Sequence, residues 1–153
     1  MSSPRVMMLK SVGVVKTKAS REEVSNKTYL SKIVINKEFT KALEGLSGFS
    51  HVFVIFLMHE VAAEERKTLQ VHPKGRKDLP LVGVFATRSP TRPNPLGLTL
   101  VELMSIKGNV MTVRGLDAFD GTPVLDIKPY RRIDMSKEAK FPQWMGKLDF
   151  EEA

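Results

Sequence analysis

The sequence predicts a mainly β protein: a small antiparallel barrel-like or sandwich domain of about seven short strands, with one short helix. Two observations support this class. Short runs rich in apolar and β-branched residues recur along the chain and are separated by Gly, Pro and polar turns. Only one segment has the period of a helix, so the alternation of strands and helices that builds a parallel sheet is missing. The 153 residues suit a single domain.

Three strands are predicted in the first 60 residues. Residues 9–17 form the first, and residues 29–36, with three consecutive β-branched residues, form the second. The polar stretch 19–28 between them is predicted to be a loop. Residues 51–60, HVFVIFLMHE, are a continuous apolar run without alternation, which is typical of a central strand buried on both faces.

The one helix is predicted between the second and third strands. Phe39, Ala42, Leu43 and Leu46 lie at i, i+3, i+4 and i+7, which places them on one helical face. Asn36 is a candidate cap for its start.

The remaining strands are predicted at residues 81–87, 98–106, 110–116 and 122–130. The second and third of these flank Lys-Gly-Asn, a sequence suited to a hairpin turn. The segment that follows is polar, with Phe141, Trp144 and Met145 as candidate docking points.

Composition restricts the classes of function. Lys plus Arg number 24 and Asp plus Glu 17, so the net charge is 24 − 17 = +7, which favours a polyanionic partner such as RNA. The chain has no cysteine, and its three histidines have no metal-ligand spacing, so we expect no metal. There is no apolar run long enough to cross a bilayer and no signal-peptide pattern at the N-terminus. We expect a soluble, cytoplasmic protein without a membrane partner.

A rigid, charged corner interrupts the strand pattern at residues 88–97, RSPTRPNPLG. Its three prolines fix φ and restrict the residues before them to extended conformations, and Gly97 is expected to take a positive φ. Such a loop would hold Arg88 and Arg92 in fixed places, where a guanidinium can bind carboxylate or phosphate. Taken alone, the segment is more typical of a proline-rich turn with solvated arginines.

A second polar constellation lies in residues 116–130, LDAFDGTPVLDIKPY. Asp126, Lys128 and Tyr130 are spaced two apart, so on a strand they share one face. If that face lines a pocket, it offers a base, a cation and an aromatic hydroxyl. The alternative is a surface ion pair that contributes at most about 1 kcal/mol.

The two stretches in this order, with LEGLSGFSHVFVIFLMHE and SVGVV upstream, resemble the TsaA/TrmO-like family of tRNA methyltransferases. The resemblance covers most of residues 9–132, which leaves 133–153 as a C-terminal tail and gives the compact form without an extra C-terminal domain. It implies a β-barrel-like homodimer that binds S-adenosyl-L-methionine near the subunit interface. It also implies methylation of N6 of the threonylcarbamoyl-adenosine beside the tRNA anticodon.

Carried over position by position, the resemblance implies a cofactor-binding set consisting of His59, Glu60, Arg88, Leu98, Arg114, Gly115, Leu116 and Asp117. Arg88 can pair with the cofactor carboxylate. Asp117 or Glu60 can accept hydrogen bonds from the ribose hydroxyls or the amino group, and Leu98 can cover the adenine.

For the reaction itself, Asp126 is the candidate base or orienting group, and Lys128 and Tyr130 shape the site. The candidate phosphate contacts are Arg92, Lys74, Arg76, Lys77, Arg131 and Arg132.

The first long loop, residues 21–32, departs from the family, where many members carry a Pro-Arg-Gln segment. Because that loop contributes to the active site in relatives, two alternatives stay open. One is an RNA-binding β-module without catalysis, and the other is a methyltransferase of the same fold that acts on a different RNA or a small molecule.

Overall fold

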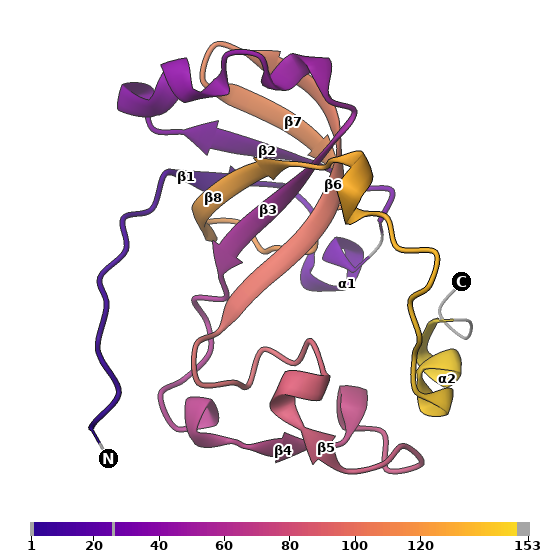
Figure 1. Cartoon of the computed structure of the whole chain (residues 1–153). Helices are drawn as coiled ribbons and strands as arrows, with labels where there is room; N and C mark the ends of the chain where they lie inside the picture. Colours follow the sequence, from indigo (N-terminus) through magenta and orange to yellow (C-terminus); the bar gives the residue numbers. More distant parts are fainter. Residues whose placement is uncertain (1, 26, 150–153) are drawn as a thin grey trace. The chain divides into compact units, whose positions relative to one another are not determined.

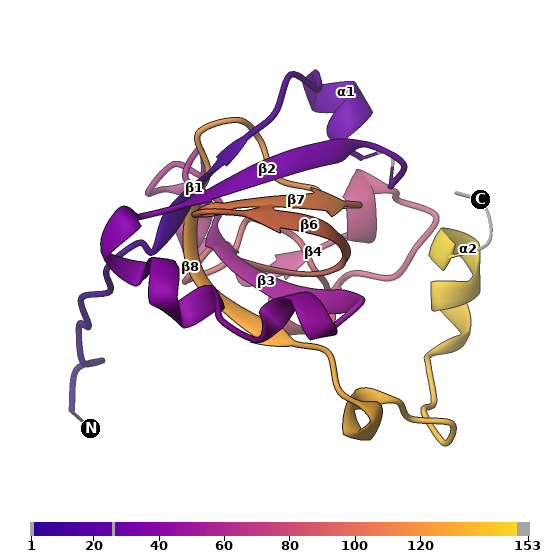
Figure 2. The ribbon, with the colours of Figure 1, turned by 90° about the horizontal axis from the view of Figure 1, so that it is seen from above.

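The computed structural model describes residues 2–25 and 27–149. Six antiparallel strands close into a barrel in the order β1-β2-β7-β6-β3-β8 (Figures 1 and 2). The strands are β1 Gly13–Lys16, β2 Leu30–Ile35, β3 His51–Leu57, β6 Leu96–Lys107, β7 Val110–Arg114 and β8 Pro123–Pro129. The mainly β, barrel-like class predicted from the sequence is therefore confirmed.

The other regular elements are short. Strands β4 (Gln70–Val71) and β5 (Val82–Gly83) pair with each other as a separate two-stranded sheet. The α-helices are α1 (Arg21–Val24) and α2 (Gly146–Asp149). The 3₁₀ helices are Lys37–Leu43, Leu46–Gly48, Glu65–Lys67, Pro73–Gly75, Val84–Ala86, Arg132–Asp134 and Gln143–Met145.

The chain forms two compact units. The first, which contains the barrel, comprises Met1–His59 and Leu96–Tyr130. The second comprises Glu60–Pro95 and Arg131–Ala153, and contains β4, β5 and the described part of the tail. A single-domain organisation over 1–153 stays a prediction, and residues 1, 26 and 150–153 lie outside the described residues.

The barrel core is built from alternate residues of each strand. On β3, Val52, Val54 and Phe56 are buried, whereas Phe53, Ile55 and their alternate neighbours are partly exposed. The prediction that this strand is buried on both faces is wrong, because a strand in a closed barrel turns only one face inward. Its outer face is apolar in sequence but remains accessible.

The predicted helix is present as a 3₁₀ helix, Lys37–Leu43, rather than a continuous helix to residue 46. Leu43 is buried, and Phe39 and Leu46 pack against the barrel core as the periodicity predicted. Gly45 then takes a φ of 85°, which ends the helical path before the next short turn.

Three local predictions differ from the structure. Only Val82–Gly83 of the predicted strand 81–87 forms a ladder, because Val84–Ala86 turns into a 3₁₀ helix. The predicted loop 19–28 contains α1, whose start is stabilised by a capping box between Ser20 and Glu23. Gly97 does not have a positive φ; it is required because the ring of Phe56 occupies the space where a Cβ would lie.

Within residues 2–25 and 27–149, no helix has both the length and the apolar character needed to span a membrane. The same residues contain no group of three His, Asp or Glu side chains placed to hold a metal ion.

Candidate functional site

One arginine of the corner at residues 88–97 stabilises it through hydrogen bonds to nearby backbone carbonyls. The Nη1 group of Arg92 donates hydrogen bonds to the carbonyl oxygens of Thr87 at 2.9 Å and Ser89 at 3.2 Å. Its guanidinium carbon also lies 5.9 Å from the ring centroid of Phe85, a cation–π contact. Arg92, predicted from sequence as a phosphate contact, therefore folds back onto the backbone of the corner.

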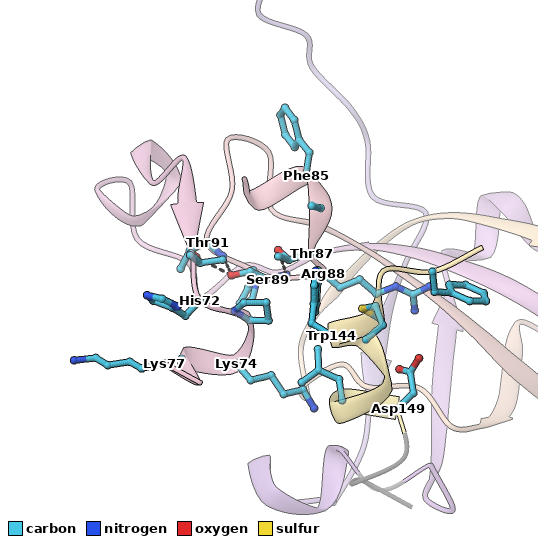
Figure 3. Close-up of a pocket in the computed structure, with 18 residues that line it drawn as sticks. His72, Lys74, Lys77, Phe85, Thr87, Arg88, Ser89, Thr91, Trp144 and Asp149 are labelled. Carbon is cyan, nitrogen blue, oxygen red and sulfur yellow. Dashed lines mark hydrogen bonds between the residues drawn. The ribbon is translucent and has the colours of Figure 1, made fainter. Parts of the chain in front are cut away.

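Arg88 behaves differently. Its side chain is exposed, and across the described ranges 2–25 and 27–149 it makes no hydrogen bond or ion pair. It lines a cavity of about 1080 Å³ within the second unit, together with Lys74 and Lys77 (Figure 3). The candidate cofactor arginine and two candidate phosphate lysines thus lie on one cavity.

We call this space the corner cavity. It is lined by Val71, His72, Pro73, Lys74, Gly75, Lys77, Phe85, Ala86, Thr87, Arg88, Ser89, Pro90, Thr91, Phe141, Trp144, Met145, Leu148 and Asp149. Three segments therefore build it: the turn after β4, the corner with the residues before it, and the tail. The docking residues predicted in the tail, with Trp144 at their centre, are walls of this cavity.

The turn after β4 is held in a defined shape. Lys74 has a φ of 53°, the one positive φ of a non-glycine residue in the described ranges, and Gly75 follows with a φ of 69°. His72 donates from Nδ1 to the carbonyl oxygen of Leu79 at 2.8 Å, because a carbonyl can only accept. A left-handed lysine is uncommon and strained, so the surrounding structure fixes its place on the cavity wall.

The remaining predicted phosphate contacts lie elsewhere. Arg76 binds Asp78 through two hydrogen bonds, with Nη2 and Oδ2 2.7 Å apart, and this pairing lowers the pKa of the Asp78 carboxyl. Arg131 and Arg132 are exposed at the start of the tail and are not among the cavity-lining residues. The structure therefore brings Lys74 and Lys77 to the cavity but not the other three arginines.

The second motif lies on the barrel. The Nζ atom of Lys128 is 3.0 Å from Oδ2 of Asp126, as expected for residues on one face of a strand. The backbone N–H of Ile127 also donates to Oδ1 of Asp126 at 2.9 Å. The ring of Tyr130 packs edge-on against Phe53 at a centroid distance of 5.7 Å. These three predicted residues form a partly exposed row in which the carboxylate is already paired.

Asp126 also lines a second cavity of about 440 Å³ in the first unit. The other walls of that cavity are mainly apolar side chains from the 3₁₀ helices between β2 and β3. Lys128 and Tyr130 do not line it.

The segment after β7 presents backbone rather than side chains. Leu116 is 2% exposed and belongs to the barrel core, so only its main chain can contact a ligand. The Nη1 group of Arg114 pairs with Oε2 of Glu102 at 3.0 Å. Gly115 has a φ of 91°, which turns the chain out of the strand. The hydroxyl of Thr99 donates a hydrogen bond to Oδ1 of Asp117.

The predicted cofactor set is divided between the two units. Leu98 lies on β6, and about half of its surface is exposed. The next residue, Thr99, bonds Asp117 and thereby links β6 to the segment after β7. His59 is exposed two residues beyond the end of β3. Glu60 and Arg88 belong to the second unit, where Arg88 alone lines the corner cavity.

The corner cavity has the volume and several of the groups that S-adenosyl-L-methionine requires. Its volume reaches the upper end of small-molecule sites. Arg88 can bind a carboxylate. On the barrel, the Asp117 carboxylate can accept hydrogen bonds from hydroxyl or amino groups. Taken separately, each unit therefore contains polar groups of the kinds that this cofactor's carboxylate, hydroxyl and amino groups bind.

Sequence reasoning missed several members of this site. Thr99 and Glu102 orient Asp117 and Arg114, but nothing in a lone Thr or Glu on a strand signals such pairing. His72 has no metal-ligand spacing in the sequence, and its place on the cavity depends on the turn after β4. The tail aromatics were recognised as docking points, but the cavity they help to build depends on contacts distant in sequence.

Comparison with known proteins places the chain in a family. The family model of the tRNA-methyltransferase O N-terminal domain matches residues 9–135. A probable S-adenosyl-L-methionine-binding protein of Methanocaldococcus jannaschii is 40% identical over 131 residues, which cover 84% of this chain and 97% of that protein. The mouse tRNA (adenine(37)-N6)-methyltransferase is 47% identical over 91 residues, 58% of this chain and 20% of that protein.

Solved structures agree with this family. A crystal structure of TrmO matches with a TM-score of 0.72 and 29% identity, over 90% of this chain and 64% of that one. A crystal structure of TrmO from Pseudomonas aeruginosa matches with a TM-score of 0.71 and 27% identity, over 92% and 62% of the two chains. The chain thus spans somewhat less than two thirds of these solved proteins. It belongs to the family defined by the tRNA-methyltransferase O N-terminal domain.

Proposed function

We propose that the chain is an S-adenosyl-L-methionine-dependent methyltransferase that acts on tRNA. The observation that supports this most strongly is the family match over residues 9–135, which includes both the corner and the Asp126 motif. The mouse relative is named as a methyltransferase of N6 of adenine 37. We further propose that the acceptor here is N6 of the threonylcarbamoyl-adenosine beside the anticodon, and that the protein works in the cytoplasm.

The chemistry of the acceptor defines what the protein must provide. When bound, S-adenosyl-L-methionine supplies an electrophilic methyl group on a sulfonium sulfur. Adenine N6 is a weak nucleophile because its lone pair is delocalised into the ring. Alignment of the reacting groups can contribute about 7–11 kcal/mol, and a positioned base typically adds about 10²–10⁴-fold. We propose that Asp126 orients the amine or accepts its proton, with Lys128 and Tyr130 shaping the site.

For the cofactor we propose separate contacts in each unit. In the second unit, Arg88 binds the cofactor carboxylate, which its exposed and unpaired guanidinium in the described part of the chain supports. In the first unit, Asp117 accepts hydrogen bonds from the ribose hydroxyls or the amino group, and Leu98 covers the adenine. The proposed set also includes His59, Glu60, Arg114, Gly115 and Leu116.

We also propose that the protein is a homodimer that associates through the outer face of β3 and β6. The outward-facing, register-paired residues of this face are Leu96 with Leu57, Leu98 with Ile55, and Leu100 with Phe53. The three β6 leucines are exposed. A contiguous apolar surface of this kind is typical of a protein interface. Because Leu98 is also a proposed cofactor contact, this face agrees with a cofactor bound near the subunit interface.

Transfer of label tests the proposal. The purified protein would be mixed with S-adenosyl-L-methionine carrying a labelled methyl group and with tRNA from a strain that lacks the modification. We expect label in the tRNA and none in the same tRNA that already carries the methyl group. If no tRNA acquires label, the substrate proposal is wrong.

An RNA-binding module without catalysis is the second candidate, favoured by the +7 charge and by the cationic residues of the corner cavity. Cofactor binding separates the two. A methyltransferase is stabilised by S-adenosyl-L-methionine or its demethylated product through mass action, whereas an RNA module melts unchanged. For a methyltransferase of the same fold with a neutral small-molecule substrate, activity would not fall steeply between low and moderate salt, as it would with RNA.

A further inference from the structure

The corner cavity has a wall that the family model does not include. The model match ends at residue 135, whereas Phe141, Trp144 and Met145 lie beyond it and line the cavity. The tail therefore adds aromatic surface to a cavity whose other walls come from the matched segment. Its 3₁₀ helix Gln143–Met145 and helix α2 hold this surface in place.

The charge of the corner cavity favours an anion. Among the described residues, its lining includes three cationic side chains, Lys74, Lys77 and Arg88, and one carboxylate, Asp149, which gives 3 − 1 = +2. In Figure 3, Lys74 and Arg88 extend toward the tail segment that carries Trp144, whereas Lys77 points away from it. S-adenosyl-L-methionine has a net positive charge, because its sulfonium and ammonium outnumber its carboxylate. A phosphate-bearing ligand complements the cavity as a whole better than this cofactor does.

An aromatic wall beside cations is the combination that binds a nucleotide of single-stranded RNA. Bases stack on aromatic side chains, and lysine and arginine hold the adjoining phosphates. Trp144 is partly exposed and Phe141 is exposed, so both have ring surface available for stacking. The cavity volume of about 1080 Å³ is sufficient for one nucleotide with its phosphate.

We propose that the tail makes the corner cavity a nucleotide-binding site for the RNA substrate, with one base stacked on Trp144 and its phosphate held by Lys74. This inference rests on the proposed function, since it assumes an RNA substrate. It adds specificity-determining residues, Trp144 and Phe141, that lie outside the segment matched by the family model. The tail thereby selects an extended RNA segment in addition to the target adenine.

Trp144 is the only tryptophan of the chain, so its fluorescence reports on this cavity alone. Tryptophan emission of the full chain would be followed during titration with tRNA that lacks the modification. We expect saturable quenching that weakens with salt, little quenching by AMP at the same concentration, and none by S-adenosyl-L-methionine alone. Quenching by the cofactor equal to that by tRNA would assign the cavity to the cofactor and overturn the proposal.

Substitution tests the stacking directly, with affinity for fluorescently labelled tRNA as the measurement. We expect Trp144→Ala to weaken binding by about 5- to 150-fold, the range for loss of one stacked base. Trp144→Phe retains most of the affinity because an aromatic face remains. Leu30→Ala, at an exposed apolar residue of the barrel unit that lines neither cavity, serves as the control and leaves affinity unchanged. Arg88→Ala is not diagnostic, because Arg88 is a proposed cofactor contact on the same cavity.

The outcomes separate this inference from the proposed function. If methyl transfer proceeds and Trp144→Ala binds tRNA as the unaltered chain does, the cavity inference is wrong and the function stands. If Trp144 is quenched by tRNA but no label is transferred, the RNA site stands and the methyltransferase proposal fails. A thermal shift with S-adenosyl-L-methionine in Trp144→Ala checks that the variant is folded. If the Trp144→Ala variant is not folded, quenching of Trp144 fluorescence by tRNA in the unaltered chain tests the inference instead.

Discussion

The guanidinium of Arg92 lies 2.9 Å from the carbonyl oxygen of Thr87 and so ties the middle of a proline-rich corner to the residue that precedes it. Arg88, in the same corner, makes no hydrogen bond or ion pair within residues 2–25 and 27–149 and lines a cavity. One arginine therefore stabilises the loop, and the other is available to a ligand. The hydrogen bonds of Arg92 therefore contribute to the rigidity of the corner, and substitutions of the two arginines are expected to have different effects.

Replacement of Arg92 by alanine is expected to destabilise the fold. The two backbone carbonyls would lose a charged donor, and hydrogen bonds of this kind contribute about 1–3 kcal/mol. Arg92→Lys should recover part of the loss, because lysine keeps the charge but lacks the planar fork. Chemical denaturation measures the effect. If Arg92→Ala leaves stability unchanged but loses tRNA affinity, Arg92 is a phosphate contact, as the sequence predicts.

Replacement of Arg88 by alanine is expected to weaken cofactor binding while leaving the melting temperature of the free protein nearly unchanged. Its side chain is exposed and makes no described polar contact, so little folding energy is lost. The melting shift produced by S-adenosyl-L-methionine measures binding. Lys77→Ala, another exposed cation on the cavity, is the matched control. A loss of tRNA affinity with an unchanged cofactor shift would remove Arg88 from the cofactor site.

The barrel was predictable because its signal is local. Short runs rich in apolar and β-branched residues marked each of the six strands, and the two-residue spacing of Asp126 and Lys128 fixed their shared face. Contacts distant in sequence were not predictable. The cavity requires Arg88 and Trp144, 56 positions apart (144 − 88), to line the same space. The role of Gly97 depends on the ring of Phe56, which no local pattern reveals.

Dimerisation through the outer face of β3 and β6 is expected to be broken by Leu100→Glu, which introduces a charge at a side chain that is 43% exposed. Leu30→Glu is the control, since Leu30 on β2 is 50% exposed and lies outside this face. Sedimentation gives the molecular mass of each variant. We expect a dimer for the unaltered chain and for Leu30→Glu, and a monomer for Leu100→Glu. A dimer that survives Leu100→Glu, or a monomeric unaltered chain, contradicts this interface.

The first long loop is expected to give a small pH dependence of stability. The Tyr29 hydroxyl donates to Glu23 at 2.6 Å and, with the capping bonds of Ser20, lowers the pKa of Glu23. A lowered carboxyl pKa contributes stability above the ordinary glutamate value of about 4.3 and loses it as the pH falls through the folded-state pKa. The same bond raises the pKa of Tyr29, so its contribution is present below about pH 10 and lost above it.

Tyr29→Phe tests this coupling. The stability difference between the unaltered chain and this variant should be present at neutral pH and shrink at both extremes. Denaturation at a series of pH values measures it, with Glu22→Gln as a control from the same helix. A difference that does not change with pH would show that the hydrogen bond does not form in solution.

The central proposal is methyl transfer to tRNA by this chain, with Asp126 in the reacting site. It is tested most directly by digesting tRNA to nucleosides after incubation with S-adenosyl-L-methionine and identifying the products by mass spectrometry. We expect threonylcarbamoyl-adenosine to gain one methyl group at N6, and Asp126→Asn to slow this conversion by about 10²–10⁴-fold without altering the cofactor-induced melting shift. Nucleosides of unchanged mass, in a protein that the cofactor does stabilise, would contradict the proposed substrate.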